Sequence, residues 1–362
     1  MTQGGIPLMR PKLPTAERIL PYLARIDGAR RYSNFGPLVA EFETRLAEHI
    51  SVRPENIVCL SSGTAGLILA LRQFDLPVGG RCAMPSWTFA ATANAACAAG
   101  LRPWFLDVDA ATWALDPAHV ARRVAASPDP VAAIVVVAPF GARLDTAAWD
   151  RLSDELRLPV VIDAAASFDA VTAGRSPTIV SLHATKPFGV GEGGLVVSTD
   201  DARISRIRRD SNFGFAGAGR VATVGINAKL SEYAAAVGLA GLDQWPDTRA
   251  AYAARAERYG AGLAKQTNLT LAPNWREGRV TSTFNIDLGQ PGAEALLRLL
   301  ADRGIEARRW WSGGCHRHPA FADFAADALP VTENLASSVI GLPFYSDLAL
   351  SEIDEVCGAL AS

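Results

Sequence analysis

The sequence predicts an α/β protein whose larger part is built around a mostly parallel sheet. A short apolar run, a loop of small polar residues and a helix-compatible run follow one another repeatedly along the chain. The apolar runs are continuous rather than alternating, as in strands that are covered on both faces. With 362 residues, 49% of them hydrophobic, the chain can form a large α/β domain and a smaller appended unit.

The first half of the chain contains most of the expected strands. A short helix is predicted at 15–26, a turn-rich segment at 31–37, and a second helix from Leu38, because apolar residues then recur every four positions as far as Ile50. Helix-compatible runs at 65–74 and 89–99 follow the first two strands. The strands are expected at 56–60, 81–85, 103–106, 133–138, 159–162, 179–182 and 194–198.

The second half of the chain predicts a smaller unit. A glycine-rich loop at 212–220 precedes an alanine-rich helix at 230–242 and a long helix at 246–265. We therefore expect a large domain over 1–245 and a small C-terminal domain over 246–362. Within the small domain, strands are predicted at 279–288, 305–310 and 339–342, and helices at 293–303 and 351–360.

Composition and charge give no indication of a nucleic-acid-binding, disulfide-rich or membrane-spanning protein. A formal charge of -2 and a pI near 6.2 give no reason to expect nucleic acid or an anionic membrane as a partner. The five cysteines are irregularly spaced in apolar surroundings, which is typical of reduced thiols. No apolar run approaches the roughly 18 residues of a membrane span. We expect a cytoplasmic protein.

One lysine stands out against this background. The chain has four lysines and thirty-one arginines, and Lys186 lies between the apolar run 178–182 and a glycine-rich turn at 189–194. Burial lowers the pKa of a lysine amine, and the neutral amine can form a Schiff base. Taken alone, the segment fits equally well a lysine that ends a strand or pairs with an acid.

Three further candidate sites lie at predicted strand ends. Asp163 ends an apolar run at the edge where open α/β sheets bind ligands, so its carboxylate can hold a proton on a pyridine nitrogen or cap the next helix. Gly63 and Thr64 join a strand to a helix, a place for phosphate, although Ser62 or Thr64 can also be an ordinary N-cap. Trp87 offers a stacking surface or a core side chain.

Together these residues supply what a pyridoxal phosphate site requires: an amine, an acid for the ring nitrogen, a phosphate loop and a stacking aromatic. The chain also resembles, over nearly its whole length, the DegT/DnrJ/EryC1/StrS family of pyridoxal phosphate-dependent sugar aminotransferases. The most specific motifs are Ser61-Ser-Gly-Thr-Ala65, Ile162-Asp-Ala-Ala165, Ser181-x-His-x-Thr-Lys186 with Gly191-Glu-Gly-Gly194, and Gly225-Ile-Asn-Ala-Lys-Leu-Ser-Glu232.

The resemblance implies the PLP-dependent transferase fold type I and a role for each motif residue. It implies pyridoxal 5'-phosphate covalently bound to Lys186, and a homodimer with shared active sites. The remaining roles implied are Asp163 on the pyridine nitrogen, Trp87 stacked on the ring, Gly63, Thr64 and Ser181 on the phosphate, and Asn227 on the phosphate of the neighbouring subunit's cofactor.

The sequence departs from the family pattern beside the aspartate. The position three after Asp163, usually Gln or His near the phenolic oxygen of the cofactor, is Ala166 here. Ser167 follows and is the candidate to substitute for it.

The implied reaction is a ping-pong transfer of an amino group from an amino acid, L-glutamate by analogy, to C-3 or C-4 of a keto-deoxysugar linked to a nucleoside diphosphate. One alternative is a dehydratase of the same family, but that branch replaces the lysine by histidine. Another is a non-catalytic regulatory homologue, which would have lost Lys186 or Asp163. A nicotinamide-dependent dehydrogenase would need G-x-G-x-x-G after a strand, and no strand here has it.

Candidates for substrate binding come from the second half of the chain and from the lysine segment. Arg220, Arg308 and Arg309 can bind a diphosphate bidentately, or form a solvated arginine face. His183 and His316 complete the set. The segment 315–318 carries three possible metal ligands but no fourth partner or recognised spacing, so no metal site is predicted.

Overall fold

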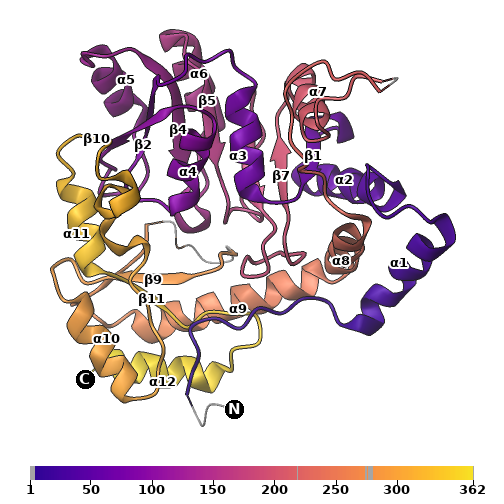
Figure 1. Ribbon diagram of the computed structural model, residues 1–362. Helices are drawn as coiled ribbons and strands as arrows, with labels where there is room; N and C mark the ends of the chain where they lie inside the picture. Colours follow the sequence, from indigo (N-terminus) through magenta and orange to yellow (C-terminus); the bar gives the residue numbers. More distant parts are fainter. Residues whose placement is uncertain (1–4, 218, 274, 276–279, 362) are drawn as a thin grey trace.

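The protein is described by a computed structural model that covers residues 5–217, 219–273, 275 and 280–361. Figure 1 shows a large sheet with helices on both faces and, below it, a small sheet beside the long helix α9. None of the helices in the described part of the chain has the length and apolarity needed to cross a bilayer.

The large sheet has eight strands in the order β1-β7-β6-β5-β4-β2-β3-β10. Only β7 runs antiparallel to its neighbours among these described strands, so the prediction of a mostly parallel sheet is confirmed. The strands are β1 Ile57–Leu60, β2 Arg81–Pro85, β3 Arg102–Leu106, β4 Val131–Val137, β5 Val160–Asp163, β6 Thr178–Ser181, β7 Gly194–Val197 and β10 Ala325–Ala326.

Helices cover both faces of this sheet because successive strand residues point to opposite sides. In β1, Ile57 and Cys59 pack into one buried cluster, whereas Val58 and Leu60 pack into another. The first cluster includes side chains of α1 Ala16–Ala29, α2 Pro37–Ile50, α5 Pro117–Ala125, α6 Thr146–Leu156 and α8 Glu232–Asp243. The second includes α3 Gly63–Arg72, α4 Ala90–Ala98 and α7 Asp201–Asp210.

The small sheet is antiparallel, in the order β11-β9-β8. The core of the first face continues into this region through α9, β9 and α12. The elements are α9 Trp245–Leu263, β8 Thr270–Leu271, β9 Phe284–Asp287, α10 Ala293–Asp302, α11 Pro330–Ser338, β11 Val339–Leu342 and α12 Leu350–Leu360. Short 3-10 turns lie between α10 and α11, at Trp311–Gly313, Cys315–Arg317 and Pro319–Phe321.

Two strand predictions in this region need correction. The strand expected at 305–310 does not form, because its backbone is shared between two partners: Ile305 bridges to Ile6, and Arg308 bridges to Gly341. The strand expected at 279–288 forms only over Phe284–Asp287, as β9; residues 280–283 and 288 are not in a strand, and residue 279 lies outside the described residues. The predicted division of the chain into domains at 245/246 stays a proposal.

Candidate active site

A cavity of about 630 Å³ opens where the carboxyl ends of β4, β5 and β6 face the start of α3. This is the edge at which open α/β sheets bind ligands. The opposite wall comes from the C-terminal part of the chain, through residues 308–312 and Ser282, Thr283 and His318. Five predicted site residues of the large sheet line the cavity together: Gly63, Thr64, Asp163, Ser181 and Lys186.

Lys186 is held in the turn that follows β6. Its backbone N–H donates to the carbonyl oxygen of His183 at 2.9 Å. Burial lowers the pKa of the Lys186 amine, while the nearby Asp163 carboxylate opposes this shift. An amine with a lowered pKa is neutral for a larger fraction of the time, and the neutral form is the nucleophile.

The glycines after Lys186 shape the turn. Gly191 has a φ of +95°, a left-handed conformation that side chains disfavour. A Cβ on Gly194 would lie 2.5 Å from the backbone nitrogen of Gly63. The missing side chain at Gly194 therefore allows β7 to pack directly against the start of α3.

Asp163 is the most buried charged group of the cavity, with 5% of its surface exposed. Its Oδ2 accepts a hydrogen bond from Thr92 Oγ1 at 2.7 Å, and its Oδ1 accepts one from the backbone N–H of Ala165 at 3.2 Å. Burial raises the pKa of Asp163, while these two donors and Lys186 lower it. The carboxylate is thus buried but has partners that stabilise its charged form.

The start of α3 has the features of an anion site. Ser62 is the N-cap, since its Oγ accepts from the backbone N–H of Ala65 at 3.1 Å, and the first amides of a helix have no acceptor within it. A Cβ on Gly63 would lie 3.2 Å from the Cβ of Ser181, so the glycine lets these two chain segments approach. Gly63, Thr64 and Ser181 therefore meet at one point of the cavity wall.

For Trp87 the structure favours the core alternative over the stacking role that the resemblance implies. Only 1% of its surface is exposed, and its ring packs edge-on against Trp311 at 5.0 Å and against Phe140 at 6.4 Å. Phe89 lines the cavity instead and is 66% exposed. The sequence contains no signal for this, because Phe89 is the first residue of the helix-compatible run 89–99, whereas in the structure it is the N-cap of α4.

Two other cofactor candidates also lie outside the cavity. The hydroxyl of Ser167 is buried and donates to the carbonyl oxygen of Ala142 at 3.1 Å, so Ser167 does not substitute for the missing polar side chain; Ala166 lines the cavity. Asn227 is exposed, and its Oδ1 accepts from Lys229 Nζ at 2.8 Å.

His183 lines the cavity beside the lysine turn. Its Nδ1 accepts from the backbone N–H of Thr185 at 3.2 Å and lies 2.8 Å from the Thr185 hydroxyl. The proton of the neutral ring is therefore on Nε2, which lies 3.5 Å from Oε1 of Glu192. His183 thus presents an N–H donor at the mouth of the cavity.

The arginine candidates differ in what already binds them. Arg308 lines the cavity, and its guanidinium lies 5.4 Å from the ring centroid of Trp310. Arg309 also lines it, but its Nε donates to the carbonyl oxygen of Ala336 and its Nη1 bonds to Glu294. Arg308 is the better placed of the two to bind a ligand.

Arg220 and His316 are not part of the cavity lining. Arg220 is exposed in the loop at 212–220. The Nδ1 of His316 lies 2.7 Å from Ser86 Oγ, and its Nε2 lies 3.6 Å from Glu333, so its ring links the C-terminal segment to the end of β2. His318, which sequence reasoning considered only as one of three possible metal ligands, lines the cavity in its place.

An aromatic wall at the cavity combines Phe140, which follows β4 of the large sheet, with Trp311 of the C-terminal part. Phe140 and Trp311 stack with centroids 4.2 Å apart and planes 8° from parallel. Phe140, Trp311 and Ser312 all have positive φ, an uncommon conformation for residues with a side chain, which stores strain and clusters at ligand sites. Such a surface suits the flat, apolar part of a ligand.

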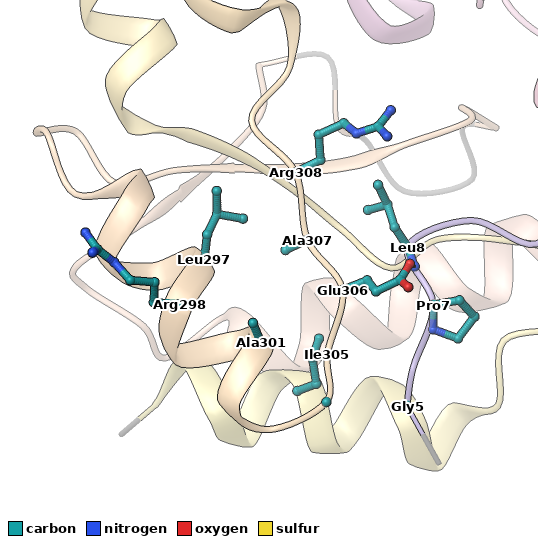
Figure 2. A pocket seen from close by; sticks show the side chains of 11 residues that line it. Gly5, Pro7, Leu8, Leu297, Arg298, Ala301, Ile305, Glu306, Ala307 and Arg308 are labelled. Atoms are coloured by element: carbon teal, nitrogen blue, oxygen red, sulfur yellow. The ribbon is translucent and has the colours of Figure 1, made fainter. Parts of the chain in front are cut away.

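A second hollow, of about 710 Å³, lies between the N-terminal segment and α10 (Figure 2). Its apolar floor includes Leu297 and Ile305, and Glu306 at its edge accepts from the backbone N–H of Leu8 at 2.9 Å. Of the candidate substrate residues, Arg308 lines both hollows. This second hollow lacks Lys186, Asp163 and the start of α3.

Known proteins resemble the chain over almost its full length. A family model described as the DegT/DnrJ/EryC1/StrS aminotransferase family matches residues 15–361. Protein Rv3402c of Mycobacterium tuberculosis is 33% identical over 98% of the chain and 89% of its own length. The dTDP-4-amino-4,6-dideoxy-D-glucose transaminase of Shigella dysenteriae is 29% identical, over 97% of each chain.

The fold is matched equally well. The crystal structure of a putative PLP-dependent aminotransferase from Bacillus cereus superposes with a TM-score of 0.93 at 28% identity, and the match covers 99% of this chain and 100% of that one. The match extends over the large sheet, the small sheet and the segment that forms the aromatic wall.

Proposed function

The chain belongs to the DegT/DnrJ/EryC1/StrS aminotransferase family and has the fold of the PLP-dependent aminotransferases, and from this premise we propose that it is a nucleotide-sugar aminotransferase. It moves an amino group from an amino acid, L-glutamate being the first candidate, to C-3 or C-4 of a keto-deoxysugar carried by a nucleoside diphosphate. The observation that carries the proposal is the meeting of Lys186, Asp163 and the start of α3 in one cavity.

The residues present fit pyridoxal phosphate. The amides at Gly63 and Thr64, with the hydroxyl of Ser181, suit its phosphate, because Gly63 leaves room for close approach. The buried carboxylate of Asp163 suits a protonated ring nitrogen. Lys186 supplies the amine for the covalent link.

Phe89, rather than Trp87, offers the apolar ring surface at the cavity. Trp87 supports the aromatic wall from behind, through Trp311 and Phe140. We therefore assign the stacking role to Phe89.

The cofactor, when bound, supplies an electron sink for the carbon that carries the amino group. The chain supplies the rest. With the cofactor bound, Lys186, with its lowered pKa, would be the residue that takes the proton from the α-carbon of the donor and returns it in the next step. Asp163 keeps the ring nitrogen protonated, which makes the sink effective.

The acceptor sugar binds between the lysine turn and the aromatic wall. Arg308 binds the diphosphate. At the cavity, the partner described for its guanidinium is the aromatic ring of Trp310, which leaves its N–H groups available to phosphate oxygens. His183 and Glu192, whose Nε2 and Oε1 atoms lie 3.5 Å apart, both line the cavity and offer polar groups to the sugar hydroxyls. The stacked pair of Phe140 and Trp311 presents an apolar surface to the sugar or the base.

The proposed homodimer completes the site. Near the exposed Asn227 lie two large apolar side chains that are also exposed. The ring of Phe213 lies 4.8 Å from the Lys229 Nζ that donates to Asn227, and the ring of Phe215 lies 6.2 Å from that of Phe213. Phe213 donates its backbone N–H to the carbonyl oxygen of Ile226, and Asn212 bridges to Asn227, so these residues form one surface. An exposed apolar surface of this kind supports a partner subunit.

The substrate half of the proposal is tested by product analysis. Purified protein is incubated with pyridoxal phosphate, glutamate and a panel of nucleoside-diphosphate 3-keto- and 4-keto-deoxysugars, and products are identified by mass spectrometry. An amino sugar formed from one member supports the proposal. A sugar that loses a hydroxyl without gaining nitrogen points to a dehydratase, and no product from any member contradicts the substrate class.

A further inference from the structure

Behind Asp163 lies a chain of buried hydroxyl groups that the sequence motifs do not include. Thr92 Oγ1 is 2.7 Å from Asp163 Oδ2, and Thr88 Oγ1 is 2.8 Å from Thr92 Oγ1. Both threonines are 1% exposed. Thr88 ends the loop after β2, and Thr92 lies in the first turn of α4, so their positions relative to β5 depend on the fold and not on adjacency in the sequence.

The direction of these hydrogen bonds follows from counting protons. A hydroxyl has one hydrogen, and an ionised carboxylate can only accept. Thr92 donates its hydrogen to Asp163. Its oxygen must then accept from Thr88 in the bond between the two hydroxyls. The series of hydrogen bonds therefore runs from the Thr88 hydroxyl through the Thr92 hydroxyl to Asp163, where it ends on the negatively charged carboxylate.

The electrostatic consequence concerns Oδ2. In a buried site, hydrogen bonds polarise one another, and a hydrogen bond to a charged group is stronger than one between neutral groups. The other oxygen of Asp163 has a backbone donor, Ala165, at the longer distance of 3.2 Å. The hydrogen bond from Thr92 is thus the shorter of the two that orient the Asp163 carboxylate and favour its ionised form.

Thr88, the first hydroxyl in this series of hydrogen bonds, is held by residues of the C-terminal segment. Cys315 Sγ donates to the carbonyl oxygen of Thr88 at 3.4 Å. The N–H of Thr88 donates to the carbonyl oxygen of Ser86, and the hydroxyl of Ser86 lies 2.7 Å from Nδ1 of His316. Thr88 is therefore held by the C-terminal segment, while Thr92 is bonded to Asp163 at the end of β5.

We propose that Thr92, supported by Thr88, is a positioning residue for Asp163: it orients the carboxylate toward the ring nitrogen and keeps it ionised. This inference rests on the proposed function, since it assigns Asp163 to the cofactor. Thr92 does not line the cavity, whereas Thr88 does; the hydrogen of each hydroxyl is already donated within this series of hydrogen bonds.

The test is Thr92→Val, which keeps the shape of the side chain and removes the donor. Losing a hydrogen bond to a charged group should weaken pyridoxal phosphate binding by about tenfold or more, measured as the Kd of the cofactor by absorbance titration. The Asp163 pKa should rise further, because a stabilising donor is lost. The acid limb of the pH profile of kcat/KM should therefore move to higher pH.

Two more variants and a control make the result specific. Thr92→Ser keeps the hydroxyl and should restore both readouts, whereas Thr88→Val should shift both in the same direction by a smaller factor. Thr178→Val, at a threonine of β6 that is equally buried and donates to the carbonyl oxygen of Ser176, should leave both unchanged. Thr88→Val also keeps the test decisive if Thr92→Val does not fold.

The outcomes separate this inference from the proposed function. Wild-type protein that binds no pyridoxal phosphate contradicts the proposed function. Wild-type protein that binds it, together with Thr92→Val or Thr88→Val of unchanged Kd and unchanged acid limb, contradicts the positioning role alone. An equal loss in Thr92→Val and Thr178→Val would show a packing effect and would also overturn the positioning role.

Discussion

The two walls of the cavity differ in how they are built. The wall from the large sheet consists of strand ends and the start of a helix, with Lys186, Asp163 and Gly63 fixed by the parallel strands and α3. The wall from the C-terminal part consists of irregular backbone and short turns, with Trp311 and Ser312 at positive φ. Strand ends, the start of α3 and the turn after β6 hold most of the residues proposed for the cofactor, whereas irregular backbone of the C-terminal part holds most of those proposed for the substrate.

This difference suggests a division of labour. Strand ends hold side chains in precise positions, which chemistry on a bound cofactor requires, while loops can vary without disturbing the sheet. Changes to the sheet wall should therefore alter cofactor binding and the chemical step. Changes to the C-terminal wall should alter the KM for the sugar.

The largest expected effect is that of Lys186→Ala on the sheet wall. Loss of the general acid-base group should lower kcat by about a hundredfold or more, since such groups contribute roughly 10² to 10⁴ in rate. Lys12→Ala is the matched control, because Lys12 is exposed near Asp347 and is not among the residues that line the cavity. Turnover measured by glutamate consumption that is equal in both variants would contradict the account.

The next effect concerns the C-terminal wall. Arg308→Ala should raise the KM for the sugar nucleotide by about tenfold, the cost of one bond to a charged group, with kcat changed little. Arg309→Ala should mainly lower the melting temperature, because it removes the bonds to Ala336 and Glu294. Steady-state kinetics and thermal melts of both variants measure these effects. A raised KM in Arg309→Ala together with a lowered melting temperature in Arg308→Ala would refute the distinction between the two arginines.

A third comparison lies within one loop of the sheet wall. Phe89→Ala should weaken cofactor binding by several-fold, about the 0.5–1.5 kcal/mol of an aromatic contact, with the apo melting temperature unchanged because Phe89 is largely exposed. Trp87→Ala should destabilise the fold by about 3–5 kcal/mol, because it leaves a cavity behind Trp311. Denaturant unfolding and cofactor titration separate the two. Cofactor binding weakened only by Trp87→Ala would favour the original sequence prediction.

The smallest expected effect is on the stability of the apo protein, which the buried, ionised Asp163 carboxylate lowers at neutral pH. Burial raises the pKa of Asp163 in the folded protein, so protonation favours the folded state and ionisation opposes it. The contribution of this group to stability is therefore present at low pH and is lost as pH rises through the folded pKa. At neutral pH, Asp163→Asn should raise the melting temperature of the apo protein by about 2 °C, roughly 1 kcal/mol.

The same substitution should weaken cofactor binding, because the charge opposite the ring nitrogen is gone. Calorimetry of the apo protein and a cofactor titration measure the two effects. An apo Asp163→Asn protein that melts below the wild type at neutral pH would show that the carboxylate is a net stabilising group, contrary to this expectation.

Sequence reasoning was most successful where regular structure positions a residue. Asp163 ends β5 as predicted, and the apolar runs around it form parallel strands, so the meeting of Asp163, Gly63 and Lys186 followed from topology. The family and the fold class are confirmed. The chemical roles of these residues stay predictions.

Sequence reasoning failed where irregular backbone decides the direction of a side chain. The loop from Ser86 to Phe89 bends after β2, so the larger aromatic, Trp87, turns into the core and Phe89 faces the cavity. His316 and His318 are two residues apart, yet only His318 lines the cavity. His316 lies within the 3-10 turn Cys315–Arg317, which ends before His318 and changes the direction of the backbone. Residue type and spacing do not encode these turns.

The most direct test of the central claim is to locate the covalent link to pyridoxal phosphate. The holoenzyme is reduced with borohydride, digested and analysed by peptide mass spectrometry, which distinguishes among the four lysines, Lys12, Lys186, Lys229 and Lys265. We predict a pyridoxyl group on the peptide that contains Lys186, and none on that peptide in the Lys186→Ala protein. Stoichiometric label on another lysine, or no label in protein that binds the cofactor, would contradict the account.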